Sequence, residues 1–401
     1  MSGEESPNIS PFIPFPNRIL MGTGPSPAHP RVLQAMSSPV IGYLDPDFIP
    51  VLDEVSALLR MVFKTDDGLA MALSGTGSAG MEAGVASLLE PDDTVIVCVC
   101  GFFGERIVEM ADRVGANVVP LRSEWGRPFP SEMLENELHN HSSVKLIAVV
   151  HAETSTGVLQ PLSELSDLAK NHGSLFMVDA VTSLGGMDVP VDKTGIDYCY
   201  SATQKCLGCP PGMSPAVLSK AAQLAVKDRS KKAKSWYLDL ALIANYWSHE
   251  HVYHHTAPVN MIFALREALK IVFEEGLEAR FARHRKNGLA LRTGLEAIGL
   301  NLVVPTDSRL DQVTPFWVPS GINELDIRNN LIRDYNIEIG RGLGDFAGKV
   351  LRIGLMGESS KPEFVLSILS ALENLLPRMG YGVVKGLGVD SANKVLTDGN
   401  V

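Results

Sequence analysis

Apolar runs and segments of helical spacing alternate along the first two thirds of the chain. Apolar positions recur every three or four residues, which predicts amphipathic helices, at 47–63, 78–89, 103–114 and 161–171. Short runs that are apolar throughout predict buried strands at 93–100, 145–150, 174–181 and 197–202. Apolar strands separated by helices are typical of a mainly parallel sheet covered on both faces. We therefore expect an α/β fold.

The pattern changes after a long helical stretch at 258–296. Short strands predicted near 300–304, 312–318 and 349–355 then mix with helices predicted at 323–335 and 361–377. This mixture indicates a smaller α+β domain. At the other end, Pro, Ser and Gly are frequent, which predicts an extended arm. The expected organisation is an N-terminal arm at 1–28, a large domain at 29–275 and a small C-terminal domain at 276–401.

The charge and hydropathy of the chain exclude several kinds of partner. Among its 401 residues, 46 are acidic and 35 are Lys or Arg, so the net charge is -11. This charge gives no attraction to nucleic acid or to an anionic membrane. No apolar stretch approaches the ~18 residues of a membrane helix, and the chain ends in DGNV instead of an S-K-L-type peroxisomal signal. We expect a cytoplasmic protein that binds neither nucleic acid nor membrane.

Cysteine and histidine spacings do not indicate a metal site. The five cysteines are an odd number scattered through apolar segments, which is typical of reduced thiols. Cys206 and Cys209 have the spacing of half a zinc site, but no second pair completes it. The run SHEHVYHH at 248–255 matches no zinc or iron ligand spacing. We expect no bound metal.

The stretch ALSGTGSAGMEAG at 72–84 contains a G-x-G-x-x-G motif in Gly75, Gly77 and Gly80. A dinucleotide site also requires an acidic residue at the end of the next strand. That strand, predicted at 93–100, ends in VCVC and has no carboxylate there. Glycines before a helix also bind other phosphates, because the N–H groups and the dipole at a helix N-terminus attract anions. The motif therefore predicts a phosphate site, and an NAD-dependent dehydrogenase remains an alternative.

Two further candidate residues lie near the ends of predicted strands. Asp179 ends the apolar run FMVD, where ligands bind in open α/β sheets. Lys205 lies 26 positions later among small and apolar neighbours, and loss of hydration there would lower its pKa and free the amine to attack an aldehyde. Pyridoxal 5'-phosphate requires a phosphate cradle, a lysine for its aldehyde and a carboxylate for its pyridine nitrogen. The order and spacing of these three parts predict this cofactor.

The sequence resembles the serine and alanine-glyoxylate aminotransferases, in class V of the fold type I pyridoxal phosphate enzymes. Eight blocks in family order carry the resemblance: MGTGPSP, SGTGSAGMEA, HAETSTGVLQPL, VDAVTSLGG, SATQKCLGCPPG, SWYLDL, YHHTAP and GLGDFAGKVLRIGLMG. Together they extend over nearly the whole chain. The resemblance implies a large domain and a smaller C-terminal domain, and a homodimer whose active sites lie at the subunit interface.

The resemblance also implies roles for individual residues. Lys205 would bind the cofactor aldehyde as the catalytic lysine, and Asp179 would pair with the pyridinium nitrogen. The other implied cofactor contacts in the same chain are Thr76, Gly77, Ser78 and Gln204 on the phosphate, Phe103 on the ring face, Thr154 near the ring hydroxyl, and Val181. From the neighbouring subunit, Tyr253 and Thr256 would reach the phosphate.

Arg352 resembles the arginine that binds the substrate α-carboxylate, a role suited to two parallel hydrogen bonds from one guanidinium. Tyr43 is also assigned to the substrate. Arg341 allows two interpretations: it is an exposed loop charge, or it contacts a second carboxylate and so admits aspartate as donor.

The expected activity is transfer of the amino group of alanine, serine or aspartate to glyoxylate or a similar 2-oxo acid. Ureidoglycine-glyoxylate and pyridoxamine-pyruvate aminotransferases have similar blocks and remain alternatives. Trp236 favours the alanine and serine enzymes over the ureidoglycine branch, and Thr76 lacks the acidic residue expected in the pyridoxamine branch. All five cysteines precede residue 210, which argues against a cysteine desulfurase.

Overall fold

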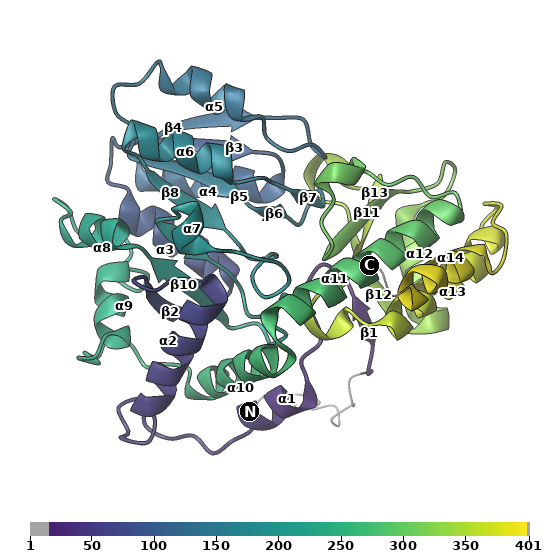
Figure 1. Cartoon of the computed structure of the whole chain (residues 1–401), viewed down its shortest axis with the longest axis horizontal. Helices are drawn as coiled ribbons and strands as arrows, with labels where there is room; N and C mark the ends of the chain where they lie inside the picture. The colour runs from purple at the N-terminus through teal and green to yellow at the C-terminus, as the bar shows by residue number, and fades with distance from the viewer. Residues whose placement is uncertain (1–15, 399–401) are drawn as a thin grey trace, which may run out of the picture.

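The computed structural model describes residues 16–398, which form two main sheets, each with its own helices (Figure 1). The seven-stranded sheet lies in the larger part of the molecule, and the four-stranded sheet lies in the smaller part on the right of Figure 1. A short hairpin of β6 (Ala152–Glu153) and β7 (Val158–Leu159) lies between them and reaches the smaller part through a bridge from Val158 to Arg309.

The larger sheet is mainly parallel, and its strand order is β2-β10-β9-β8-β5-β3-β4. Only β10 runs antiparallel to its neighbours. The strands are β2 (Leu69–Ser74), β3 (Thr94–Val99), β4 (Asn117–Arg122), β5 (Leu146–Val150), β8 (Leu175–Asp179), β9 (Tyr198–Tyr200) and β10 (Met213–Leu218). Every residue of β5 is buried, which explains why its sequence LIAVV contains no polar position. The predicted α/β class with a mainly parallel sheet is confirmed.

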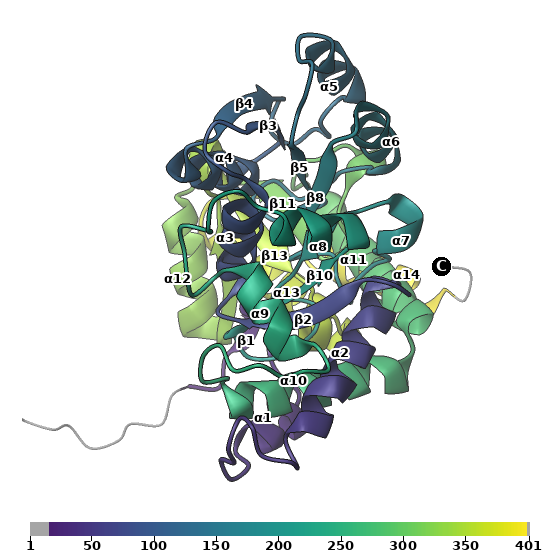
Figure 2. The same ribbon diagram turned by 90° about the vertical axis from the view of Figure 1, so that its left-hand side faces the viewer.

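Helices cover both faces of this sheet. Figure 2 shows α3 and α4 on one side of the strands and α6 and α7 on the other, while α8 and α9 lie far from the small sheet in Figure 1. The bounds are α1 (Pro30–Met36), α2 (Ile49–Phe63), α3 (Gly77–Leu88), α4 (Phe102–Val114), α5 (Ser131–Leu138), α6 (Ser163–His172), α7 (Val191–Thr194), α8 (Lys220–Lys227), α9 (Leu240–Trp247) and α10 (Val259–Glu275).

The stretch predicted as one helix at 258–296 is two helices, α10 and α11 (Leu277–Ala297). They meet at Gly276, whose backbone has φ +85° and ψ 136°. A glycine adopts this conformation readily, whereas a residue with a Cβ would be strained. The break lets α11 leave the large part of the molecule and run along the small sheet (Figure 1).

The four-stranded sheet joins the two ends of the described chain. Its order is β1-β12-β13-β11, and β1 pairs parallel with β12, with Ile19 opposite Ile337. The elements of this part are β1 (Ile19–Met21), β11 (Val313–Trp317), β12 (Ile337–Arg341), β13 (Val350–Gly354), α12 (Glu324–Tyr335), α13 (Pro362–Arg378), α14 (Leu387–Thr397), and the 3-10 turns η1 (Thr306–Ser308), η2 (Gly344–Phe346) and η3 (Gly357–Ser359). The strand predicted near 300–304 is only an isolated bridge from Leu302 to Phe316. Residues 1–15 of the predicted arm lie outside the described part.

The C-terminal segment forms α14, which packs on α11 and α13. Its N-terminus is capped by the buried Glu373 of α13, whose carboxylate accepts the backbone N–H groups of Gly386, Gly388 and Val389. A Cβ on Gly294 of α11 would lie 2.9 Å from the carbonyl oxygen of Gly388. The two helices can therefore approach closely only because a glycine stands there.

Buried hydrophobic residues form one large cluster around each main sheet, and Ala152, Leu310 and Val313 form a third, smaller cluster. Within residues 16–398, no helix is long and apolar enough to cross a membrane.

Candidate active site

One cavity lies at the carboxyl ends of β5 and β8, beside the N-terminus of α3. Nine predicted cofactor residues line it, and we call them the cavity group: Thr76, Gly77, Ser78, Phe103, Thr154, Asp179, Val181, Gln204 and Lys205. Met81, Val150 and Ala152 complete the wall. The residues come from five separate segments of one chain, and the parallel strands bring them together because all their carboxyl ends lie at the same edge.

The N-terminus of α3 provides the phosphate cradle. Gly75 has φ +133°, and Thr76 is extended at the N-cap and makes no capping hydrogen bond with its side chain. The first N–H groups of a helix have no partner within it, so an anion can accept them. A Cβ on Gly77 would lie 2.9 Å from Cγ2 of Val181, so this glycine lets the helix sit against the end of β8.

The third glycine of the motif serves packing. A Cβ on Gly80 would lie 2.2 Å from Oγ of Ser214 in β10. In a dinucleotide fold the strands before and after the glycine turn are parallel partners. Among the described strands, β2 pairs only with β10, antiparallel, and β3 lies five places away in the sheet. The NAD-dependent alternative is therefore wrong.

Asp179 is buried at the end of β8. Its carboxylate accepts the hydroxyl of Tyr200 at 2.7 Å and the backbone N–H of Val181 at 2.8 Å. Burial raises the pKa of Asp179 to about 7, because the charged form loses hydration. A cation placed against the carboxylate would restore its charge, so this group fits a protonated ring nitrogen.

Lys205 lies in a turn after β9 and not in a helix or strand. Its Nζ donates to the carbonyl oxygen of Thr23, and a Cβ on Gly24 would lie only 2.7 Å from that nitrogen. Ser26 fixes the backbone: its N–H donates to the carbonyl of Gln204 at 2.8 Å and its Oγ to that of Lys205 at 2.7 Å. The block MGTGPSP therefore holds the lysine in place.

Burial, followed by the nearby charge of Arg352, lowers the pKa of Lys205 to about 8. A much larger fraction of its amine is neutral near pH 7 than for an ordinary lysine. The neutral amine is the form that attacks an aldehyde or accepts a proton.

Arg352 lies in β13 of the small sheet and is buried. Its Nε and Nη2 donate to the carbonyl of Arg341 at 2.8 and 2.6 Å, and Nη1 donates to that of Thr154 at 2.7 Å. Since a guanidinium has five N–H groups, one remains on each terminal nitrogen. These two are the pair that a carboxylate can accept. The guanidinium of Arg341 itself is exposed and does not line the cavity.

Phe103 is positioned by a residue that the sequence analysis did not single out. The buried carboxylate of Glu153 accepts the N–H groups of Phe103 and Gly104 at 3.2 and 3.4 Å and the hydroxyl of Ser155 at 2.5 Å. It thereby caps α4, in which Phe103 is the second residue. A carboxylate three positions after the apolar run KLIAVV was the signal that could have indicated it.

The remaining predicted residues form a surface group of Tyr43, Trp236, Tyr253 and Thr256. None lines the cavity. Tyr253 is 51% exposed, and its ring lies 5.0 Å from that of Tyr43 between centroids. Trp236 is 60% exposed. His255 ties this segment to the end of β2, with Nε2 at 2.7 Å from Oγ of Ser74.

The cavity also tests whether pyridoxal phosphate fits. Among the described residues, the buried Oε1 of Gln204 has no hydrogen-bond partner. The open helix N-terminus, the buried carboxylate and the low-pKa lysine supply the polar contacts that the cofactor needs, and the Gln204 amide can donate to a phosphate through Nε2. No group of three or more His, Cys, Asp and Glu residues within 16–398 is arranged to hold a metal ion.

Comparison with known proteins agrees with this geometry. The family model described as aminotransferase class-V matches residues 48–353. The chain is 38% identical over 395 residues to (S)-ureidoglycine--glyoxylate transaminase of Bacillus subtilis, covering 94% of this chain and 95% of that protein. The crystal structure of the B. subtilis ureidoglycine-glyoxylate aminotransferase superposes with a TM-score of 0.94 at 39% identity, covering 96% and 100% of the two chains. The crystal structure of an alanine--glyoxylate aminotransferase from Nostoc sp. superposes with a TM-score of 0.89 at 45% identity, covering 93% of this chain and 97% of that chain.

The fold is therefore that of the type I aminotransferases, with a large mixed sheet and a smaller C-terminal sheet. The protein belongs to the class V aminotransferases, in the group that contains the alanine-glyoxylate and ureidoglycine-glyoxylate enzymes, which confirms the predicted family and enzyme type. Enzymes of this class use pyridoxal phosphate.

Proposed function

We propose that the protein uses pyridoxal phosphate to transfer the amino group of alanine, serine or aspartate to glyoxylate or a similar 2-oxo acid. The observation that carries this proposal is the convergence of Lys205, Asp179 and the α3 N-terminus on one cavity, with Arg352 bonded to its wall at Thr154. The cofactor supplies an aldehyde for the amino group and a ring that accepts the electrons of the broken C–H bond.

The chain's own residues bind and orient the reactants. The N–H groups of α3, with Thr76, Ser78 and Gln204, hold the phosphate, and Asp179 keeps the ring nitrogen protonated. Arg352 binds the substrate carboxylate through its two remaining N–H groups.

Lys205 moves the proton in this scheme. Its neutral Nζ takes the α-proton of the amino acid. When the 2-oxo acid is converted to an amino acid, the protonated amine gives a proton back to the α-carbon. A pKa of about 8 suits both directions, because the ideal acid–base group titrates near the working pH.

A ureidoglycine donor is the second candidate. It is favoured by the similarity to the B. subtilis enzyme over 94% of this chain. The exposed Trp236 is the residue that we expect to argue against it. A pyridoxamine donor has weaker support, since the crystal structure of pyridoxamine-pyruvate aminotransferase from Mesorhizobium loti is only 27% identical.

Visible absorption of the purified holoenzyme tests both candidates. L-alanine, L-serine, L-aspartate and fresh (S)-ureidoglycine are added one at a time, followed by glyoxylate. We expect the cofactor band to fade with one of the first three donors and to return with glyoxylate. Fading only with ureidoglycine would select the second candidate, and the absence of a band after added pyridoxal phosphate would reject the cofactor.

We also propose that two copies complete each other's active site. In support, the surface group exposes large aromatic side chains that one chain leaves uncovered. Light scattering after size-exclusion chromatography should give twice the chain mass of 43.3 kDa. A monomer that transaminates at full rate would contradict this proposal.

A further inference from the structure

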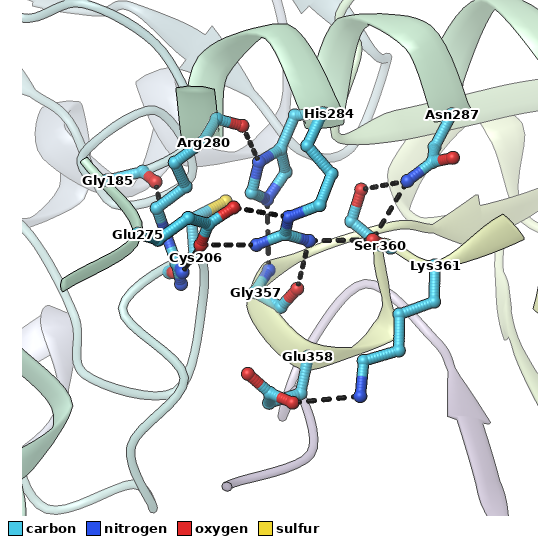
Figure 3. Close-up of polar contacts among 11 residues, drawn as sticks. Gly185, Cys206, Glu275, Arg280, His284, Asn287, Gly357, Glu358, Ser360 and Lys361 are labelled. Atoms are coloured by element: carbon cyan, nitrogen blue, oxygen red, sulfur yellow. Dashed lines mark hydrogen bonds and ion pairs between the residues drawn. The ribbon is translucent and has the colours of Figure 1, made fainter. Parts of the chain in front are cut away.

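A network of charged and polar side chains fills the junction between the two sheets, outside the cavity. It lies in the first turns of α11 and at the end of α10 (Figure 3). Arg280 is 1% exposed, and its charge is balanced by Glu275, which accepts from Nη1 at 2.5 Å. Glu275 also accepts from Nε and Nη2 of Arg283, at 2.5 and 2.9 Å. One carboxylate thus holds two guanidinium groups side by side.

Arg280 points toward the lysine turn. Its Nη2 donates to the carbonyl of Cys206 at 2.6 Å, and its Nε donates to that of Gly185 at 3.0 Å. Figure 3 shows Gly185 and Cys206 on the loops that face Arg280. Together with the two bonds from Ser26, three successive carbonyls at 204–206 receive donors from distant parts of the chain. Because the turn has no helix or strand to hold it, these bonds fix its position.

Arg283 and His284 point toward the small sheet. Nη1 of Arg283 donates to the carbonyls of Gly357 and Ser360, at 3.0 and 2.6 Å. Nε2 of His284 accepts the N–H of Gly357 at 3.0 Å, so Nδ1 carries the proton and donates to the carbonyl of Arg280. Burial lowers the pKa of His284 to about 3, so the ring stays neutral in this arrangement.

The loop that they hold follows the strand of Arg352 and touches the lysine turn. Gly357 comes five residues after Arg352, and a Cβ on it would lie 3.2 Å from the carbonyl oxygen of Cys206. With φ +56°, this position favours glycine. The lysine turn and the loop after β13 therefore meet, and the side chains of α11 bind both.

We propose that Arg280 and Arg283, joined through Glu275, form a strut that fixes the Lys205 turn relative to the Arg352 strand, so that both arginines are positioning residues for amino transfer. The proposal rests on the proposed function. Arg280 acts on the lysine through Cys206, and Arg283 acts on the substrate-binding arginine through Gly357. Neither arginine lines the cavity.

The decisive measurement needs no cofactor. In cofactor-free protein, reductive methylation of Lys205 is followed by peptide mass spectrometry across pH, which gives the pKa of its amine. We expect a midpoint near pH 8 in the unsubstituted protein. In Arg280→Lys, one ammonium cannot reach both carbonyls and Glu275 as the fork does, so the turn loosens and water reaches the lysine. The midpoint should then rise toward 10.5, the ordinary value.

Arg292→Lys is the matched control. Arg292 lies on the same helix, is 9% exposed, and donates to the carbonyl of Leu310 and to Asp311. It bonds to neither the lysine turn nor Gly357 in the described contacts. Both substitutions should lower the melting temperature, but only Arg280→Lys should move the labelling midpoint. An unchanged midpoint in folded Arg280→Lys would overturn the proposal.

Kinetics of the holoenzyme separate the two ends of the strut. We expect Arg280→Lys to lower kcat by roughly 10- to 100-fold with little change in KM, because small misplacements of a reacting group have effects of this size. Arg283→Lys should mainly raise KM for the amino acid and the 2-oxo acid. Equal effects of Arg283→Lys and Arg292→Lys would contradict its assigned role.

The outcomes also separate this proposal from the proposed function. If the unsubstituted protein neither binds pyridoxal phosphate nor transfers amino groups, while Arg280→Lys shifts the midpoint of Lys205, the strut stands and the proposed function fails. If amino transfer is present and the midpoint does not shift, only the strut fails.

Discussion

The cavity group and the surface group differ in what holds them. In the cavity group, side chains and their backbones are fixed by other segments of the same chain: Asp179 by Tyr200, Phe103 by Glu153 and Lys205 by Ser26. In the surface group, Tyr253 packs against the ring of Tyr43 and is 51% exposed. One chain therefore supplies the residues that carry out the chemistry of the site. Tyr253 and Thr256, which are assigned to a neighbour's phosphate, are both exposed, as expected if a second copy covers them.

The largest effect should come from the centre of the cavity group. Lys205→Ala should lower kcat by about 10³-fold or more, because both covalent attachment and proton transfer need its amine. Turnover of L-alanine with glyoxylate measures the loss. Lys220→Ala is the matched control, since Lys220 is exposed and pairs only with Asp67. Near-normal turnover by Lys205→Ala would show that the cavity does not carry the reaction.

A substitution of Arg352, at the edge of the cavity, should reduce activity less than Lys205→Ala and mainly through KM. Arg352→Lys leaves the carbonyls of Thr154 and Arg341 competing with the substrate for one ammonium. We expect kcat/KM to fall about 10²-fold, mainly through KM, since a lost charged hydrogen bond and an unpaired buried group each contribute one to three kcal/mol. Arg309→Lys is the control: Arg309 donates to the carbonyl of Val304 and to the carboxylate of Glu296, and its substitution should have little effect. A loss confined to kcat would assign Arg352 another role.

Local patterns predicted four strands of the large sheet, β3, β5, β8 and β9, but neither β4 nor β10. Apolar runs such as LIAVV become β5 because a strand buried on both faces has no polar position. The strand β4 was not predicted, and Pro120 within it argues against a strand on sequence alone. The structure puts β4 at the edge of the sheet, where a missing N–H is tolerated. Likewise β1 forms only because β12, over 300 residues later, lies beside it.

The cavity group could be predicted for a related reason. Asp179 and the glycines of α3 stand at ends of elements, where spacing along the chain already determines which edge of the sheet they reach. Glu153, Ser26 and Arg280 support the site through contacts between distant segments. Contacts between distant segments leave no periodic pattern in the sequence. The sequence analysis therefore identified the reacting groups and missed the residues that support them.

The surface group should affect cofactor binding only in the active site of a second copy of the chain. Tyr253→Ala removes a hydroxyl assigned to the partner's cofactor phosphate, so we expect about a tenfold weaker affinity for pyridoxal phosphate, as for loss of one hydrogen bond to a charged group. Fluorescence titration of the cofactor-free protein measures it. Trp317→Ala, at another partly exposed aromatic, is the control. If Tyr253→Ala binds the cofactor normally as a dimer, the surface group has no part in the site.

The smallest expected effect is a dependence of stability on pH, which comes from the cavity group and not from the surface group. Burial raises the pKa of Asp179 from 3.8 to about 7, so the stability that its proton provides is complete below pH 3.8 and lost as the pH rises to 7. Burial lowers the pKa of Lys205 from 10.5 to about 8, so its contribution is complete above pH 10.5 and lost as the pH falls to 8. Between pH 7 and 8, the stabilising contributions of both Asp179 and Lys205 are therefore lost.

Cofactor binding should therefore raise the melting temperature most between pH 7 and 8, by a few degrees more than at pH 5 or 10. Asp179→Asn should remove the acidic limb of this profile and Lys205→Met the basic limb, because each deletes one titration. Tyr253→Ala should lower the whole curve without changing its shape, since the surface group contributes none of these titrations. Differential scanning calorimetry with and without pyridoxal phosphate measures the difference. A flat profile would mean that water already reaches Asp179 and Lys205, so the cavity group would be no better enclosed than the surface group.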